Sequence, residues 1–268
     1  MSGMKKRNWY LSFGLAISAV MLVYMVLGFF WTPHDPGKLS GADKLDPPSF
    51  SHIFGCDHLG RDVFSRTLDG AGTTLIIALA VLAIGFVFGI LIGALCGYYG
   101  GAVDGAVMRI CDAITAFPSI LLAMVVIAIT GRGTYNVIAA LGILFIPSFA
   151  RLVRGEFIKY RDRDFVQSAR LAGVPAWRII FVHILPNTWP VLLSGLTIGF
   201  NNAVLSEASM SFLGIGVGPA EASLGRMLSE AQGCLFSAPW CTVFPALVVI
   251  LIILGIGMIG EGIRERMV

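Results

Sequence analysis

Long apolar stretches alternate with short polar segments along most of this chain. A bilayer core is crossed by about 20 apolar residues in a helix, and six stretches approach that length. They cover residues 9–31, 73–97, 110–130, 134–150, 184–205 and 242–260. Charged residues near the start of the third stretch and the shortness of the fourth leave the ends of these two least defined. The pattern predicts an all-α integral membrane protein with six transmembrane helices.

The first apolar stretch follows a basic cluster at residues 5–7 and therefore resembles a secretory signal peptide. It is longer than the apolar core of a signal peptide, however, and no small-residue cleavage pattern follows it. We therefore expect a retained anchor. In this interpretation residues 1–31 form a cytoplasmic tail with the first transmembrane helix, and residues 32–72 form an extracytoplasmic loop.

Basic residues are distributed unevenly between the two sides of this topology. With the N-terminus inside, the cytoplasmic segments carry thirteen of the 19 lysines and arginines. Such an excess is the usual mark of cytoplasmic segments, so both termini are expected in the cytoplasm. The same distribution accounts for the formal net charge of +3, and a nucleic-acid partner is not needed to explain it.

The composition supports the membrane interpretation. Hydrophobic residues make up 56% of the chain and charged residues only 13%, against about 25% charged residues in a typical soluble domain. The five cysteines form no C-x-x-C pair and have no metal-ligand spacing. Cys234 and Cys241 fall on the extracytoplasmic side, so a disulfide between them stays open.

A stripe of glycines marks one face of the second apolar stretch. Gly85, Gly89, Gly93 and Gly97 recur at every fourth position, which places them on one side of a helix where another helix can approach closely. The stripe predicts a helix-packing face. The sequence does not say whether the partner helix belongs to this chain or to another.

A polar segment of about 30 residues separates the fourth and fifth stretches. Its charges are too dense for the membrane, because one charge at the bilayer centre costs about 2.5–3.5 kcal/mol on insertion scales. Residues 165–171 have helical spacing, Gly173 is a natural helix stop and Pro175 suits the first turn of a second helix. We predict a compact helix–turn–helix on the cytoplasmic surface. The alternative is a solvated loop that binds anionic lipid headgroups.

The sequence VQSARLAGVPAWRIIFVHILP in this segment resembles the EAA loop of ATP-binding-cassette importer permeases, in which Glu-Ala-Ala is followed by Gly and then by I-x-L-P. Gln167, Ser168 and Ala169 stand at the EAA positions and Gly173 at the glycine. Gln167, Ser168 and His183 depart from the pattern, although its spacing is intact. The resemblance implies contact with a partner ATPase through Gln167, Ser168, Ala169, Arg170, Gly173, Pro175 and Pro186.

Three further stretches narrow the resemblance. FGCDHLGRDVFSRTLDGAGTTL, AFPSILLA and SEASMSFLGIGV are similar to blocks of the dipeptide, oligopeptide and nickel permeases. The resemblance is to the shorter of the two permease subunits of such importers. It implies the type I importer permease fold, with a five-helix core over residues 73–260, the EAA loop over 151–186 and a cytoplasmic tail over 261–268.

The resemblance also implies a division of labour. The chain has no G-x-x-x-x-G-K-[ST] phosphate loop and no catalytic constellation at persuasive spacing, so we expect a non-catalytic subunit that binds no cofactor itself. A second homologous permease, two ATPases that bind ATP and Mg²⁺, and an extracytoplasmic solute-binding protein are the implied partners. The bacterial or archaeal plasma membrane is the implied location.

Two sets of polar residues are candidates for contact with the transported substrate. Glu207 lies at the outer end of the fifth stretch, where it could contact substrate or form a structural pair. The chemistry of His52, Cys56, Asp57 and His58 suits nickel, although salt bridges offer another role for this block. Peptides and nickel or a metal chelate both stay open as substrates. Rival hypotheses are a self-sufficient secondary transporter and a membrane scaffold without transport activity.

Overall fold

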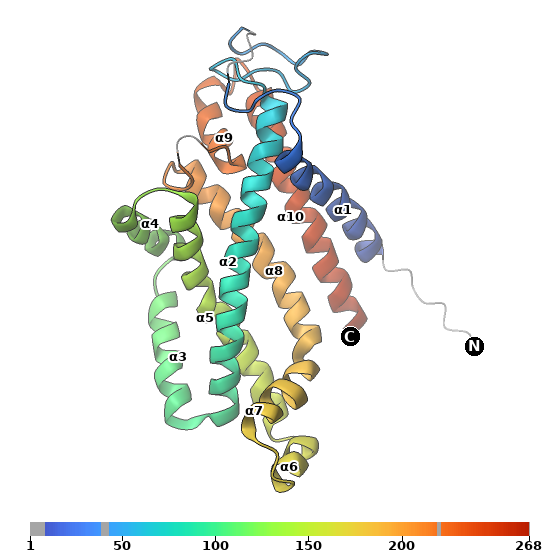
Figure 1. Cartoon of the computed structure of the whole chain (residues 1–268), viewed down its shortest axis with the longest axis vertical. Coiled ribbons are helices and arrows are strands. Elements are labelled where there is room, and N and C mark those ends of the chain that lie inside the picture. The colour runs from blue at the N-terminus through green and yellow to red at the C-terminus, as the bar shows by residue number, and fades with distance from the viewer. Residues whose placement is uncertain (1–8, 39–42, 219–220, 268) are drawn as a thin grey trace, which may run out of the picture.

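The computed structural model describes residues 9–38, 43–218 and 221–267. Within these ranges the chain is helical and has no β-strand, which confirms the predicted all-α class. Most of the long helices run along one axis of an elongated molecule (Figure 1). The helices are α1 (Trp9–Phe30), α2 (Val63–Tyr99), α3 (Gly101–Thr115), α4 (Ser119–Thr130), α5 (Thr134–Arg161), α6 (Asp164–Leu171), α7 (Ala176–Arg178), the π-helix η1 (Ile179–Ile184), α8 (Leu185–Phe212), α9 (Leu224–Glu230), the 3₁₀-helix η2 (Ala231–Cys234) and α10 (Trp240–Met267).

The predicted span over residues 110–130 is not one helix. Helices α3 and α4 meet at an angle of 84°, and Pro118 stands at the break. A proline disfavours helical backbone in the residue before it, and Pro118 itself is extended, with ψ 124°. Among the described residues five helices are long and apolar enough to cross a membrane, and the bent pair of α3 and α4 makes a sixth if it is one span.

Two helices extend well beyond the predicted apolar stretches. Helix α2 begins at Val63, ten residues before the predicted start, because the carboxylate of Asp62 accepts a hydrogen bond of 2.7 Å from the backbone N–H of Ser65 and caps the helix. Helix α5 continues past residue 150 to Arg161. Hydropathy identifies only the apolar part of each helix. The polar residues at the helix ends were therefore not included in the predicted spans.

The glycine stripe of α2 packs against α5 of the same chain. A Cβ atom placed at Gly89 would lie 2.4 Å from the Cβ of Phe149, and one at Gly97 would lie 2.5 Å from the Cβ of Phe157. Real Cβ atoms do not approach this closely. The predicted packing face is therefore confirmed, and its partner is a helix of this chain.

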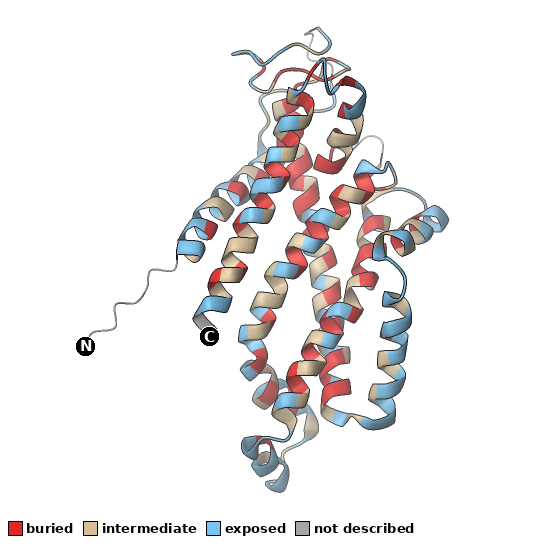
Figure 2. Cartoon of the chain, turned by 180° about the vertical axis from the view of Figure 1, so that it is seen from behind, coloured by how far each residue is buried: buried red, intermediate tan, exposed pale blue. Residues whose placement is uncertain are grey.

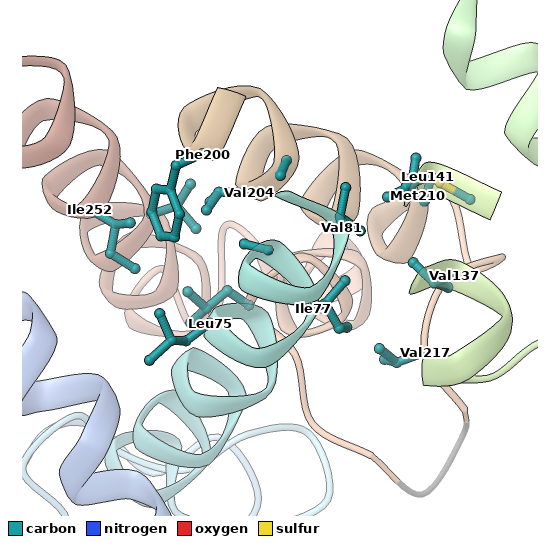
Figure 3. Packing of buried hydrophobic residues seen from close by; sticks show 14 of the residues in the cluster. Leu75, Ile77, Val81, Val137, Leu141, Phe200, Val204, Met210, Val217 and Ile252 are labelled. Carbon is teal, nitrogen blue, oxygen red and sulfur yellow. The ribbon is translucent and has the colours of Figure 1, made fainter. Parts of the chain in front are cut away.

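The core lies where α2, α5, α8 and α10 meet. Figure 3 shows Leu75 of α2 on the side of Phe200 of α8 and Ile252 of α10, and Ile77 and Val81 of α2 on the side of Leu141 and Val137 of α5. Buried residues occupy the faces that these helices turn toward one another, and exposed residues occupy the outward faces (Figure 2). Helices α3 and α4 lie at the side of the bundle and are mostly exposed. Many outward-facing residues are large and apolar, as expected for helices surrounded by lipid.

The two ends of the bundle differ in character. Helices α6 and α7 project from one end, and α9 lies at the other end with the loop between α1 and α2 (Figure 1). Helix α1 begins and α10 ends on the side toward α6 and α7. At the α9 end, the carboxylate of Asp57 accepts hydrogen bonds from Arg61 and Arg66, at 2.7 and 2.6 Å, and both arginines also bind Glu230. These ion pairs join the loop to α9.

Candidate functional site

Helix α6, the following turn and helix α7 (residues 164–178) form a knob at one end of the bundle (Figure 1). The turn depends on Gly173, whose φ is +74°. The N–H of Gly173 donates to the carbonyl of Arg170 and the N–H of Val174 to the carbonyl of Ala169, both at 3.0 Å. This is a Schellman motif, which satisfies the last carbonyls of α6. The predicted helix, glycine turn and second helix are therefore all present.

One face of the knob is anchored in the bundle. Val166 of α6 is fully buried, in a cluster with Phe157 of α5, Ile180 of η1 and Leu192 of α8. The guanidinium of Arg170 lies 4.8 Å from the ring centroid of Tyr98, at the end of α2, within the range of a cation–π contact. The knob is thereby attached to three long helices at once.

The opposite face of the knob carries exposed apolar side chains. Leu171 is 90% exposed and Trp177 is 58% exposed. Neither residue was among the predicted coupling residues, although helical geometry contained a signal for Leu171. Val166 and Leu171 are five positions apart, which is about 140° around a helix, so only one of them could face the core. An apolar tip at a polar end of the bundle is suited to insertion into a groove of a partner protein.

The predicted coupling residues divide into two groups. Gln167, Ser168, Arg170, Gly173 and Pro175 are exposed on the knob, and Ala169 is half-buried there. The side-chain amide of Gln167 donates to the backbone carbonyl of Asp162 at 3.0 Å, so it also closes the end of α5. Pro186 lies apart from the tip, at the beginning of α8.

A π-helix connects the knob to α8. This π-helix is η1 (Ile179–Ile184). At its end the N–H of Leu185 donates to the carbonyl of Ile180, five residues earlier. The next residue, Pro186, has no N–H to continue the ladder. Single turns of π-helix are rare and occur often at functional sites. The irregular backbone therefore lies at the junction between the knob and a membrane-spanning helix.

A groove of about 510 Å³ lies between α5 and α8, with the start of α4 at its edge. Its apolar lining includes Phe145 and Ile198. No charged side chain, histidine or cysteine is among the residues that line it. Its polar lining consists of uncharged hydrogen-bonding side chains: Ser119, Ser148, Asn202, Ser206 and Ser209. The groove can therefore accept and donate hydrogen bonds to a ligand without adding a charge or a strong metal ligand.

Glu207 is on α8 but does not line this groove. Its side chain is fully buried and faces α2, where its Oε2 atom accepts a hydrogen bond of 2.9 Å from the hydroxyl of Thr74. Its Oε1 atom accepts one of 2.7 Å from Ser211, whose oxygen in turn lies 3.4 Å from the N–H of Val217. These bonds favour the structural interpretation of Glu207, as a link between α2, α8 and the loop that follows.

The four residues predicted as metal ligands lie in the loop before α2, and the one group of potential ligands found among the described residues contains only His52 of these four. Asp57 belongs to the arginine network, and the carbonyl of Cys56 accepts from the indole of Trp240 at 3.2 Å. His52 turns toward Asp62 instead. Among the described residues, the potential metal ligands that lie within 4.8 Å of one another are His34, His52 and Asp62.

The five cysteines are buried. Cys234 and Cys241 lie in one small apolar cluster below the loop, together with Val63 and Ala238. The pair that the sequence left open as a disulfide is unbridged here.

The sequence matches one family over residues 89–267, described as binding-protein-dependent transport system inner membrane component. It is 36% identical over 262 residues to a dipeptide transport system permease protein of Alkalihalophilus pseudofirmus, covering 98% of this chain and 86% of that protein. It is 38% identical over 259 residues to a glutathione transport system permease protein of Pectobacterium atrosepticum, covering 94% and 86%. With the corresponding Escherichia coli protein the identity is 40% over 263 residues, covering 97% and 87%.

The fold is similar to that of a solved transporter structure. A chain of the methionine ABC transporter MetNI, in inward-facing conformations, superposes with a TM-score of 0.62 at 21% sequence identity. The superposition covers 76% of this chain and 96% of that chain. At this identity the likeness concerns the fold, and it agrees with the predicted type I importer permease architecture.

Proposed function

The chain belongs to the family of binding-protein-dependent transport system inner membrane components, and from this premise we propose that it carries small peptides as the permease subunit of an ATP-driven importer. Members of this family are non-catalytic, multi-pass membrane subunits of ABC transporters. The rival hypotheses of a secondary transporter and of a scaffold without transport activity are therefore set aside.

The groove between α5 and α8 supports a peptide substrate. Its volume of about 510 Å³ is in the range of pockets for small organic ligands. Serine and asparagine side chains suit the amide groups of a peptide, whereas nickel would require imidazole, thiolate or carboxylate ligands, which are not among the residues that line the groove. The names of the relatives, which refer to dipeptide and glutathione, point the same way. Import of nickel or a metal chelate remains the alternative.

Reconstitution tests the substrate directly. Proteoliposomes that contain this chain with a second permease, the ATPases and the binding protein should accumulate a radiolabelled dipeptide or glutathione when ATP and Mg²⁺ are supplied. A matched assay with radioactive nickel should give no ATP-dependent uptake. Accumulation of nickel without peptide uptake would overturn the peptide proposal and favour the alternative.

The two neighbouring asparagines of α8 provide a variant that tests the groove and a control for it. Asn202 is exposed on the groove side, whereas Asn201 donates a hydrogen bond of 3.1 Å to the carbonyl of Ile253 in α10. Asn202→Leu should lower peptide uptake about two- to tenfold, the loss expected for one hydrogen bond, without lowering the unfolding temperature. Asn201→Leu should lower the unfolding temperature. Unchanged uptake by Asn202→Leu would argue against this groove as the pathway.

We propose a position for each of the remaining partners at one of the two ends of the bundle or beside it. The knob would insert into an ATPase that supplies ATP and Mg²⁺ chemistry, since this chain has no phosphate loop. The other end of the bundle would face the solute-binding protein, and a second homologous permease would complete the pathway. This arrangement puts both termini in the cytoplasm of a bacterial or archaeal cell. ATP binding must favour one conformation over another for the transporter to work.

The glycine turn of the knob gives a separate test of coupling. A side chain at Gly173 would meet no atom within 4 Å, so the effect of a substitution comes from its backbone alone. Left-handed backbone costs an L-residue roughly 1–2 kcal/mol, which shifts the turn equilibrium about 5- to 30-fold. Gly173→Val should reduce ATP-dependent uptake at normal membrane insertion. Gly173→Asn should retain more activity, because asparagine tolerates this conformation. Uptake at the wild-type level by Gly173→Val would contradict a coupling role for the turn.

A further inference from the structure

Three side chains from separate segments converge at the α9 end of the bundle. His34 follows α1, His52 lies in the long loop and Asp62 caps the beginning of α2. The Nδ1 atom of His52 is 2.9 Å from one carboxylate oxygen of Asp62, and the Nδ1 atom of His34 is 3.8 Å from the other. The centroids of the two imidazole rings are 4.7 Å apart. All three potential ligand atoms lie within 4.8 Å of one another.

The position of His34 is fixed by the backbone. Its N–H donates a hydrogen bond of 3.0 Å to the hydroxyl of Ser65, in the first turn of α2. Its Nδ1 atom is buried and has no hydrogen-bond partner among the described residues. A buried nitrogen without a partner costs free energy, so this atom, which lies 3.8 Å from a carboxylate oxygen of Asp62, is available to a ligand.

Asp62 is also short of positive charge. The residue is only 1% exposed, and a carboxylate in such a place needs charged partners or several hydrogen bonds. The neighbouring arginines Arg61 and Arg66 form their ion pairs with Asp57 and Glu230 instead. Asp62 accepts bonds from His52 and from the N–H of Ser65. Binding of an ion at the Nδ1 atom of His52 would release the proton of that nitrogen and would replace its hydrogen bond to Asp62 by two bonds to the metal.

We propose that His34, His52 and Asp62 form a binding site for a divalent transition metal such as Zn²⁺. Ligands about 2.0–2.1 Å from a tetrahedral zinc ion lie about 3.3 Å apart, and the two measured separations of 2.9 and 3.8 Å bracket that value. Imidazole and carboxylate together suit zinc, nickel or copper and not the harder magnesium or calcium. The side chain of His34 is 36% exposed, so the site lies close to the surface, where water can serve as a fourth ligand.

Such an ion would join α1, the long loop and the cap of α2 into one unit. The site shares no residue with the groove between α5 and α8, so the metal would be a resident ion and not the transported substrate. The proposal stands whether the importer carries peptides or nickel. Its tests therefore measure metal binding and stability, and transport activity is not needed.

Calorimetry on the full-length chain tests the site. The protein is purified in detergent through a tag without histidines, stripped with a chelator and titrated with Zn²⁺. We expect one ion per chain and a higher unfolding temperature with Zn²⁺, because a ligand that binds only the folded state stabilises it. Co²⁺ should give the visible absorption of a four-coordinate ion. The absence of both stoichiometric Zn²⁺ binding and this absorption in the wild-type protein would overturn the proposal.

Two histidine variants complete the test. His34→Ala removes a partly exposed ligand without touching the His52–Asp62 bond, and should weaken Zn²⁺ binding at least tenfold, since even an outer-shell partner is worth 10- to 100-fold. His58→Ala removes a histidine at the same end of the molecule but outside the cluster, and should leave binding unchanged. Equal affinity in the two variants would mean that the histidines bind Zn²⁺ nonspecifically, which also rejects the site.

Discussion

Replacement of Leu171 by aspartate is expected to abolish ATP-driven uptake while the chain remains folded and inserted. Leu171 is 90% exposed at the tip of the knob, so its substitution removes almost no contact within this chain, and surface changes of this kind usually alter stability by less than about 0.5 kcal/mol. Burial of a leucine in a partner groove contributes about 1.5–3 kcal/mol. The substitution should therefore weaken binding of the ATPase more than about tenfold.

Co-purification and uptake assays measure this effect. The variant should lose the ATPase during purification, and its unfolding temperature should match that of the wild type. Leu171→Met is the matched control, because it keeps an apolar side chain of similar volume, and it should bind the ATPase normally. If Leu171→Asp retained both the ATPase and uptake, the tip of the knob would not be the contact surface.

Replacement of Glu207 by alanine should destabilise the protein strongly. Its carboxylate accepts hydrogen bonds from Thr74 and Ser211 in a fully buried place, and each buried group that loses its partner costs about 1–3 kcal/mol. We expect a loss of about 2 kcal/mol or more, seen as a lower unfolding temperature in detergent and a lower amount of protein in the membrane.

Glu207→Gln separates the structural role from a role in substrate binding. The side-chain amide is isosteric, and it can accept from one hydroxyl while its NH₂ group donates to the other. Stability and uptake should both stay near the wild-type values. A variant with normal stability but without uptake would instead show that the negative charge itself contacts the peptide.

The sequence predicted well those features whose causes are local. The apolar stretches define helices because each can be recognised from its own residues, and the knob was predictable because Gly173 and Pro175 determine the turn between its helices. The broken third span was wrongly predicted as one helix although Pro118 marked the break. Its hydropathy continues across the proline, and hydropathy measures burial in lipid and not the direction of the backbone.

Features that depend on distant contacts were not predictable in the same way. Glu207 was a reasonable substrate candidate from its position in the chain, and only the packing of α8 on α2 shows that it faces Thr74. His52 was one of the predicted metal ligands, and the potential ligands that lie beside it in the structure are His34 and Asp62 and not the adjacent Cys56 and Asp57. These neighbours come from the folding of the loop, which no local spacing encodes.

The glycine contact between α2 and α5 has a mechanical consequence. Gly89 lies against Phe149, and Gly97 against Phe157, so closely that a Cβ atom at either glycine would overlap its neighbour. Sliding of one helix along the other would bring larger residues of α2 into these contacts. We therefore expect α2 and α5 to move as one rigid unit. At 1.5 Å per residue, the 37 residues of α2 extend about 55 Å, from Asp62 at one end to Tyr98 beside the knob at the other. A tilt applied by the ATPase at one end would therefore displace the opposite end by leverage, without any change in the shape of the helices between.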